Sequence, residues 1–298
     1  MTEQPDEAEL PRAVALAWGV AANPQRGPKR EMSVERIVEV AMQLADAGGL
    51  ASVSMAAVAS ELGFTPMSLY RYVSAKDDLV LLMQESGIGV PPETIAEADG
   101  WRAGLTALEH EQLAAYVEHP WLLDIPVPSM PVTPNDLAWL DAGLQVLAET
   151  GLSAEERVAV VLAVGAQARW EGSVRRSHVD AVTAGRDARD AAMLAALVTP
   201  EEFPAVAAAL DEGVFAPGSS ADPFVFGLER VLDGVEVFLS GRSPAVVSPV
   251  IDPLDAEAER DPRYKEAVKA RREAEKKVRE ARKRERELLR SAREKLRR

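Results

Sequence analysis

Apolar residues between positions 33 and 83 recur three and four places apart, the spacing that lines one face of an α-helix. The first stripe consists of Ile37, Val40, Ala41 and Leu44. Ser33 stands just before this stripe, where a hydroxyl can cap the free backbone amides of a helix start, and the glycine pair at 48–49 follows it. The pattern predicts a first helix bounded by these signals.

Three further helix-start signals follow at short intervals. Ser54 precedes MAAVASEL, Thr65 precedes a proline suited to the first helical position, and Ser74 and Asp77 have capping-box spacing. Gly63 provides a flexible corner between the second and third predicted helices. Two short helices joined by such a corner are typical of a helix-turn-helix, with residues 66–72 as the helix that enters the major groove.

Residues 84–250 are predicted to form a larger helical domain. Ser153 and Glu156 form a second capping-box pattern, which opens a predicted helix over 153–172, and another helix is predicted over 222–241. Both segments are apolar around much of their circumference, so each needs burial on more than one side. A homodimer interface would provide that burial.

The two ends of the chain differ from this pattern. Residues 1–32 contain several prolines and a small basic cluster, so we expect a flexible arm. The segment 255–298 is rich in Arg, Lys, Glu and Ala, and no Pro or Gly follows Pro262. It predicts a long charged helix, which pairs of Glu with Lys or Arg four residues apart would stabilise in solvent.

The composition narrows the fold class and excludes several activities. Hydrophobic residues make up 47% of the 298 residues but aromatic residues only 5%, which favours an all-α fold over a sheet. The chain has no cysteine, which suits the cytoplasm, and its longest apolar runs are too short to cross a membrane. We find no phosphate loop, nucleophile elbow or metal-ligand spacing, so we expect no enzyme activity, cofactor or metal.

The net charge of −14 conceals a strong segregation of charge along the chain. Residues 255–298 carry 18 Lys and Arg against 11 Asp and Glu, which leaves −21 for residues 1–254. The segment from 24 to 83 is nearly neutral and can therefore approach DNA without strong repulsion.

The stretch SMAAVASELGFTPMSLYRYVSAKDDLVLLM, together with ADAGGL before it, resembles the DNA-binding domain of the TetR family of transcriptional regulators. The resemblance covers 33–83 closely and 86–250 loosely. It implies an N-terminal three-helix DNA-binding domain and a helical ligand-binding and dimerisation domain. It also implies a homodimeric repressor that binds a palindromic operator and is released by a small-molecule effector.

The resemblance also suggests which residues contact DNA and effector. Those expected to face bases or the adjoining backbone are Thr65, Pro66, Met67, Ser68, Arg71 and Tyr72. Tyr70, Lys76 and Ser54 are expected to hold phosphates, and Arg71 suits bidentate recognition of guanine. Ala56 and Ala57 stand where many relatives have basic residues, so an arm with Arg26, Lys29 and Arg30 would follow the minor groove. Four tryptophans would line the effector cavity: Trp101, Trp121, Trp139 and Trp170.

Several alternatives remain open at this stage. Either tyrosine of the LYRYV run, and each tryptophan, can instead pack in a core. The charged tail can bind DNA or a partner, and the whole protein can be a scaffold that the helix-turn-helix only tethers to DNA. A helical enzyme is a further alternative for which the sequence offers no catalytic motif.

Overall fold

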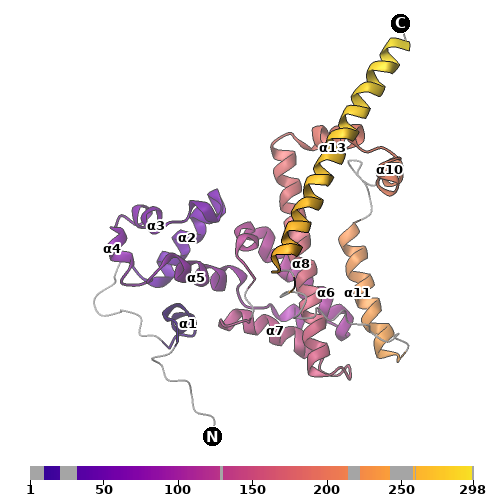
Figure 1. Ribbon diagram of the computed structural model, residues 1–298. Helices are drawn as coiled ribbons and strands as arrows, with labels where there is room; N and C mark the ends of the chain where they lie inside the picture. The colour runs from indigo at the N-terminus through magenta and orange to yellow at the C-terminus, as the bar shows by residue number, and fades with distance from the viewer. Residues whose placement is uncertain are drawn as a thin grey trace. The chain divides into compact units, whose positions relative to one another are not determined.

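The computed structural model describes residues 10–20, 32–127, 130–213, 222–241, 258 and 260–296. All regular structure in these segments is helical, which confirms the all-α prediction (Figure 1). The N-terminal elements are α1 (Arg12–Ala17), α2 (Val34–Gly48), η1 (Leu50–Ser52), α3 (Met55–Glu61), α4 (Pro66–Leu69) and α5 (Lys76–Ile88). Next come η2 (Glu93–Ile95), α6 (Gly100–Glu118), η3 (Pro120–Asp124), α7 (Pro134–Val146) and α8 (Ala154–Thr183). The remaining helices are α9 (Asp187–Leu197), α10 (Pro204–Asp211), α11 (Pro223–Leu239) and α13 (Pro262–Leu296).

The chain divides into two compact units, residues 1–243 and residues 244–298. The first unit contains two hydrophobic cores. One core joins α2, α3, α4 and α5 and includes three residues of the 121–125 segment. The other joins α6, α7, α8 and α11, so the helix-turn-helix and the larger helical region each have a core of their own.

Most of the predicted helix boundaries in the first unit are observed. The Ser33 hydroxyl accepts the Arg36 amide, and the Ser54 hydroxyl accepts the Ala57 amide. Helix α2 ends at the glycine pair, where Gly49 has φ of 74°, a conformation that glycine adopts without steric cost. Ser153 and Glu156 form the predicted capping box of α8.

Two expected helix starts differ from the sequence prediction. Helix α5 begins at Lys76 with Ala75 as its cap, so the Ser74–Asp77 capping box does not form. Helix α4 spans only Pro66–Leu69, and residues 70–72 form a turn instead of continuing the helix to Tyr72. At its start, the Thr65 hydroxyl lies 3.0 Å from the Ser68 hydroxyl and does not cap a backbone amide.

Part of the expected flexible arm is a helix that packs on the DNA-binding core. Ala13, Val14 and Ala15 of α1 are buried, and α1 contacts α5. The run AVALA therefore supplies an apolar face to the core, which accounts for an apolar stretch in an otherwise polar N-terminus. Arg26, Lys29 and Arg30 lie outside the described residues.

Helix α8 extends well past residue 172, where the sequence prediction ended it. A glycine at this position allows a close approach of α6, because a Cβ on Gly172 would lie 3.2 Å from the Tyr116 Cβ. No helix in the described segments is long and apolar enough to span a membrane.

Candidate DNA-recognition surface and effector cavity

The short helix α4 and the turn after it present two different faces. Leu69 and Val73 are fully buried in the N-terminal core, as their spacing predicts. Met67 is 74% exposed, and Thr65, Pro66 and Arg71 are exposed as well. These four side chains, which were expected to approach bases, are therefore accessible from solvent, and Ser68 is partly exposed.

The two tyrosines of this segment differ in environment. Tyr70 is 45% exposed, whereas Tyr72 is only 9% exposed and belongs to the N-terminal core. The expectation that Tyr72 faces DNA is therefore corrected: Tyr72 follows the buried Leu69 by three positions, and its backbone amide donates to the Leu69 carbonyl at 2.8 Å, which places its side chain beside Leu69 in the core. Lys76, at the start of α5, is exposed.

Arg12, which lies outside the predicted motif, contacts the backbone of the recognition segment, residues 65–72. The Arg12 guanidinium of α1 donates a hydrogen bond to the backbone carbonyl of Arg71, at 2.9 Å. The Trp18 indole, just beyond α1, donates to the Val132 carbonyl at 2.9 Å. The only sequence signal for this role was the short apolar run that places Arg12 at the start of a helix.

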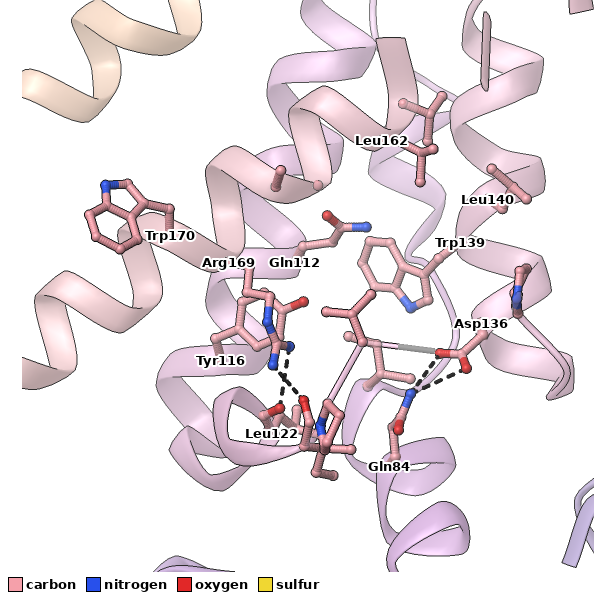
Figure 2. Close-up of a pocket in the computed structure, with 18 of the residues that line it drawn as sticks. Gln84, Gln112, Tyr116, Leu122, Asp136, Trp139, Leu140, Leu162, Arg169 and Trp170 are labelled. Atoms are coloured by element: carbon pink, nitrogen blue, oxygen red, sulfur yellow. Dashed lines mark hydrogen bonds between the residues drawn. The ribbon is translucent and has the colours of Figure 1, made fainter. Parts of the chain in front are cut away.

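The larger region contains a cavity of about 540 Å³. Side chains from α5, α6, α7 and α8 line it, and Figure 2 shows Trp139, Gln112 and Tyr116 around the same space. The segment 122–127 closes part of one wall. The volume lies in the range of small-molecule sites.

The cavity wall carries a few polar groups among apolar ones. The Oε1 atom of Gln112 is buried and has no hydrogen-bond partner, so it is an acceptor available to a ligand. Burial raises the pKa of the Tyr116 phenol above its ordinary value, which keeps the hydroxyl protonated and able to donate. The Asp136 carboxylate accepts two hydrogen bonds from the Gln84 amide.

The four predicted tryptophans occupy different places. Trp139 and Trp170 line the cavity, Trp139 buried and Trp170 65% exposed at its edge. Trp101 lines a separate hollow with residues of η2 and α7. Trp121 is 1% exposed within the N-terminal core, so its prediction as a cavity residue is corrected: its indole is held there by a hydrogen bond to Asp46.

Hydrogen bonds connect the cavity wall to the helix-turn-helix along two routes. Arg169 of α8 donates to the carbonyls of Leu122, Leu123 and Ile125, which fixes the segment around η3. From that segment the Trp121 indole donates to Asp46 of α2 at 2.7 Å, and the His119 ring lies 2.8 Å from the same carboxylate oxygen.

The second route joins α5 directly to α7. In addition to the Gln84–Asp136 contact, the Glu85 carboxylate accepts the Asn135 backbone amide at 3.0 Å. Helix α5 therefore belongs both to the N-terminal core and to the cavity wall. The described residues contain no group of three His, Asp or Glu side chains suited to bind a metal ion.

An exposed short helix after a glycine corner, in the same unit as a ligand-sized cavity, defines a helix-turn-helix protein with a helical second region. The chain belongs to the TetR family. Residues 37–83 match the family described as bacterial regulatory proteins, tetR family, and residues 94–239 match the tetracyclin repressor-like C-terminal domain. The protein is thus a DNA-binding transcriptional regulator.

Individual relatives agree with this assignment. The chain is 36% identical over 251 residues to the HTH-type transcriptional repressor DrrR1 of Streptomyces coeruleorubidus. The aligned region covers 81% of this chain and 91% of DrrR1. It is 29% identical over 142 residues to an HTH-type transcriptional regulator of Saccharopolyspora erythraea, which covers 48% of this chain and 58% of the relative.

Solved structures share the fold. Apo ActR from Streptomyces coelicolor superposes with a TM-score of 0.60 at 20% identity, covering 72% of this chain and all of ActR. The structure of a possible TetR family transcriptional regulator from the same organism superposes with a TM-score of 0.55 at 25% identity. The match covers 69% of this chain and all of that regulator. ActR has also been solved with actinorhodin, at a TM-score of 0.59 and 23% identity, covering 70% of this chain and 96% of ActR.

Proposed function

We propose that this TetR-family protein is a repressor that binds a pseudo-palindromic operator as a homodimer. Its effector is a planar aromatic molecule with hydroxyl or amino donors, and binding of that molecule releases the DNA. The observation that carries the effector class is the cavity with Trp139 and Tyr116 in its wall and the unpartnered Gln112 oxygen beside them. The name of DrrR1 as a repressor and the ligand complexes of ActR support the same function.

The cavity favours such a molecule for two physical reasons. A flat apolar ligand gains from burial against aromatic rings, which prefer offset or edge-to-face contact. A buried acceptor without a partner costs free energy, and a ligand that donates a hydrogen bond to it recovers that cost. The two routes of hydrogen bonds then offer a physical path from the cavity to α2 and α5.

At the DNA, we propose that Arg71 recognises guanine while the side chains of Thr65, Pro66, Met67 and Ser68 contact bases or the adjoining backbone. Tyr70, Lys76 and Ser54 hold phosphates, and Arg26, Lys29 and Arg30 remain proposed minor-groove contacts. The division into 33–83 for DNA and 84–250 for effector and dimerisation belongs to this proposal. No catalytic step is required, and the protein acts on DNA in the cytoplasm.

The test combines operator binding with effector release. Fluorescence anisotropy with labelled fragments tiling the gene's own upstream region, against random duplex as competitor, is expected to find one fragment bound selectively. Arg71→Ala should lower the ratio of the affinity for the selective fragment to the affinity for random duplex. Lys76→Ala should weaken binding to both DNAs, with a shallower salt dependence.

The bound fragment is then titrated with 1,8-dihydroxyanthraquinone as a planar hydroxylated probe. We expect release from the wild type, and we expect Gln112→Leu to require about tenfold more probe because one hydrogen bond is lost. Gln145→Leu, the same change outside this cavity, should behave as the wild type. If the probe releases DNA equally well from Gln112→Leu and Gln145→Leu, the assignment of the effector to this cavity is wrong. If no DNA fragment is bound selectively, the proposal that the protein binds an operator is wrong.

A further inference from the structure

Helix α13 contains a regular seven-residue repeat of charge. One column of the repeat is Lys265, Arg272, Arg279, Arg286 and Arg293. A second column is Lys269, Lys276, Lys283 and Arg290. The column of Glu266, Glu273, Glu280, Glu287 and Glu294 repeats with the same period.

The two basic columns lie on the same side of the helix. Their members alternate at spacings of four and three residues, which are the neighbours on a helix surface. We call these nine positions the basic stripe. From 265 to 293 it covers about 42 Å at about 1.5 Å per residue, and it drifts around the helix by only about 20° per heptad.

The described cations at the start of the stripe are exposed and unpaired. Lys265, Lys269, Arg272 and Lys276 take part in no ion pair within the described residues. Off the stripe, by contrast, Arg271 pairs with Glu275 at 2.6 Å. A helix that merely stabilises itself in solvent pairs its charges, so these four described cations have positive charge available for a partner.

Positive charge is concentrated in this helix and is scarce in the DNA-binding segment. Residues 262–296 contain 15 Lys and Arg against seven Glu, a net charge of +8. Residues 33–83 contain three basic residues against six acidic ones, a net charge of −3. The affinity of a protein for DNA depends strongly on Lys and Arg that neutralise phosphates and release counterions. The helix-turn-helix has few of these, whereas α13 has many.

The other side of α13 does not suit a lipid surface or a strong coiled coil. One column has alanine at 267, 274 and 281 and only then Leu288. The neighbouring column alternates apolar Tyr264, Val278 and Ala292 with charged Arg271 and Glu285, so neither column is continuously large and apolar. A membrane-surface helix needs bulky apolar residues opposite its charges, and a coiled-coil seam needs larger apolar residues at both core positions.

We propose that the basic stripe of α13 binds the sugar–phosphate backbone of duplex DNA. It acts as a second contact, independent of base sequence, that strengthens the binding made by α4. The length of the stripe exceeds one helical turn of B-DNA, about 34–36 Å, so it can reach several phosphates. The proposal requires that the protein binds DNA and does not depend on the identity of the effector.

The test compares two full-length variants with the same loss of charge. In the stripe variant, Lys265, Lys269, Arg272 and Lys276 are replaced by Gln. In the control variant, Arg263, Arg271, Lys277 and Arg284 are replaced by Gln, at exposed positions on other sides of the same helix. Gln retains helix propensity, and circular dichroism at 222 nm checks that α13 remains helical.

Anisotropy is measured with a labelled random 40-bp duplex and with the selective upstream fragment, each from 50 to 300 mM KCl. The stripe variant should bind both DNAs at least about tenfold more weakly, and its slope of log affinity against log salt should be shallower by about 3. The control variant should lose less than half as much slope. The ratio of specific to random binding should not change, whereas Arg71→Ala changes that ratio; this separates the stripe from base recognition.

Three results would overturn the proposal. Equal weakening in the two variants means that total charge matters and the stripe does not. Unchanged or tighter binding in the stripe variant means that the stripe docks on the acidic part of the protein. A lower molar mass of the stripe variant in sedimentation, with DNA binding unaltered, means that α13 joins copies of the chain.

Discussion

At the scale of single residues, Tyr70 and Tyr72 occupy different environments although they belong to the same short motif. The two side chains are two positions apart, yet one is exposed and the other lies in the core. Tyr72 follows the buried Leu69 by three positions, which are neighbours on a helix surface, and this places Tyr72 beside Leu69 in the core. Tyr70 follows Leu69 by one position and therefore points to a different side.

Arg12 is the residue whose role was least visible in the sequence. It donates to the carbonyl of Arg71, the residue proposed to recognise guanine. Arg12→Leu removes that donor, so we expect operator affinity to fall about fivefold, corresponding to about 1 kcal/mol for one exposed hydrogen bond. Anisotropy with the operator fragment measures the change.

The matched control is Arg36→Leu, which removes an exposed arginine that pairs only with Glu39 in the described structure. This variant should bind the operator as the wild type does. If Arg12→Leu leaves the affinity unchanged, α1 has no part in holding the recognition segment.

At the scale of helices, α6 and α8 enclose two carboxyl groups in contact. Glu109 is 2% exposed, and burial, followed by the neighbouring charge of Glu171, raises its pKa to about 7 from an ordinary 4.5. A raised carboxyl pKa means that the folded protein retains a proton that the unfolded chain releases. Stability is therefore lost as pH rises from about 4.5 to 7.

Glu109→Gln should remove this pH dependence. At pH 8 we expect the variant to be more stable than the wild type, by up to about 3 kcal/mol. The folded wild type must then either bury an ionised carboxylate or keep Glu109 protonated at a pH where the unfolded chain is ionised. At pH 4.5 the two should agree. Urea unfolding at both pH values measures the difference.

Glu118→Gln, at an exposed position of the same helix, serves as the control and should match the wild type at both pH values. A Glu109→Gln variant that loses stability at pH 8 would show that the ionised carboxylate contributes more through Arg175 than its burial costs.

At the scale of the whole molecule, α11 shows the need for a second protomer. Leu228 and Leu232 are buried against α8, whereas Phe226, Val237 and Phe238 remain exposed on the same helix. Phe226 and Val237 are eleven positions apart and therefore lie on one face of the helix. Exposed apolar patches are typical of interfaces, and we place the proposed dimer contact on this face.

Phe226→Asp should weaken the dimer, since it sets a charge in an interface that would otherwise exclude water. We expect the molar mass from light scattering at micromolar protein to fall towards that of a monomer, with operator affinity reduced at least about tenfold. Phe203→Asp changes another exposed phenylalanine, just before α10, and should leave the mass unchanged. If Phe226→Asp remains a dimer, the dimer interface does not lie on this face of α11.

The sequence by itself determined the local elements and the family. Capping residues, glycine corners and apolar spacing act within a few residues, so Ser33, Ser54 and the Ser153–Glu156 box could be assigned without coordinates. The same holds for the charge repeat of α13, which needs only a continuous helix. The family assignment followed from a motif carried by one short segment.

Only the tertiary structure decided which side chains meet. Trp121 and Trp139 have the same chemistry, yet one packs between Asp46 and the N-terminal core while the other lines the cavity. Arg12 and Arg71 are 59 positions apart, and the Gln112 Oε1 atom of α6 is buried close to Gly165 of α8 without a hydrogen-bond partner. These contacts depend on how helices pack over long sequence separations, and the spacing of residues within one helix contains no information about its neighbours.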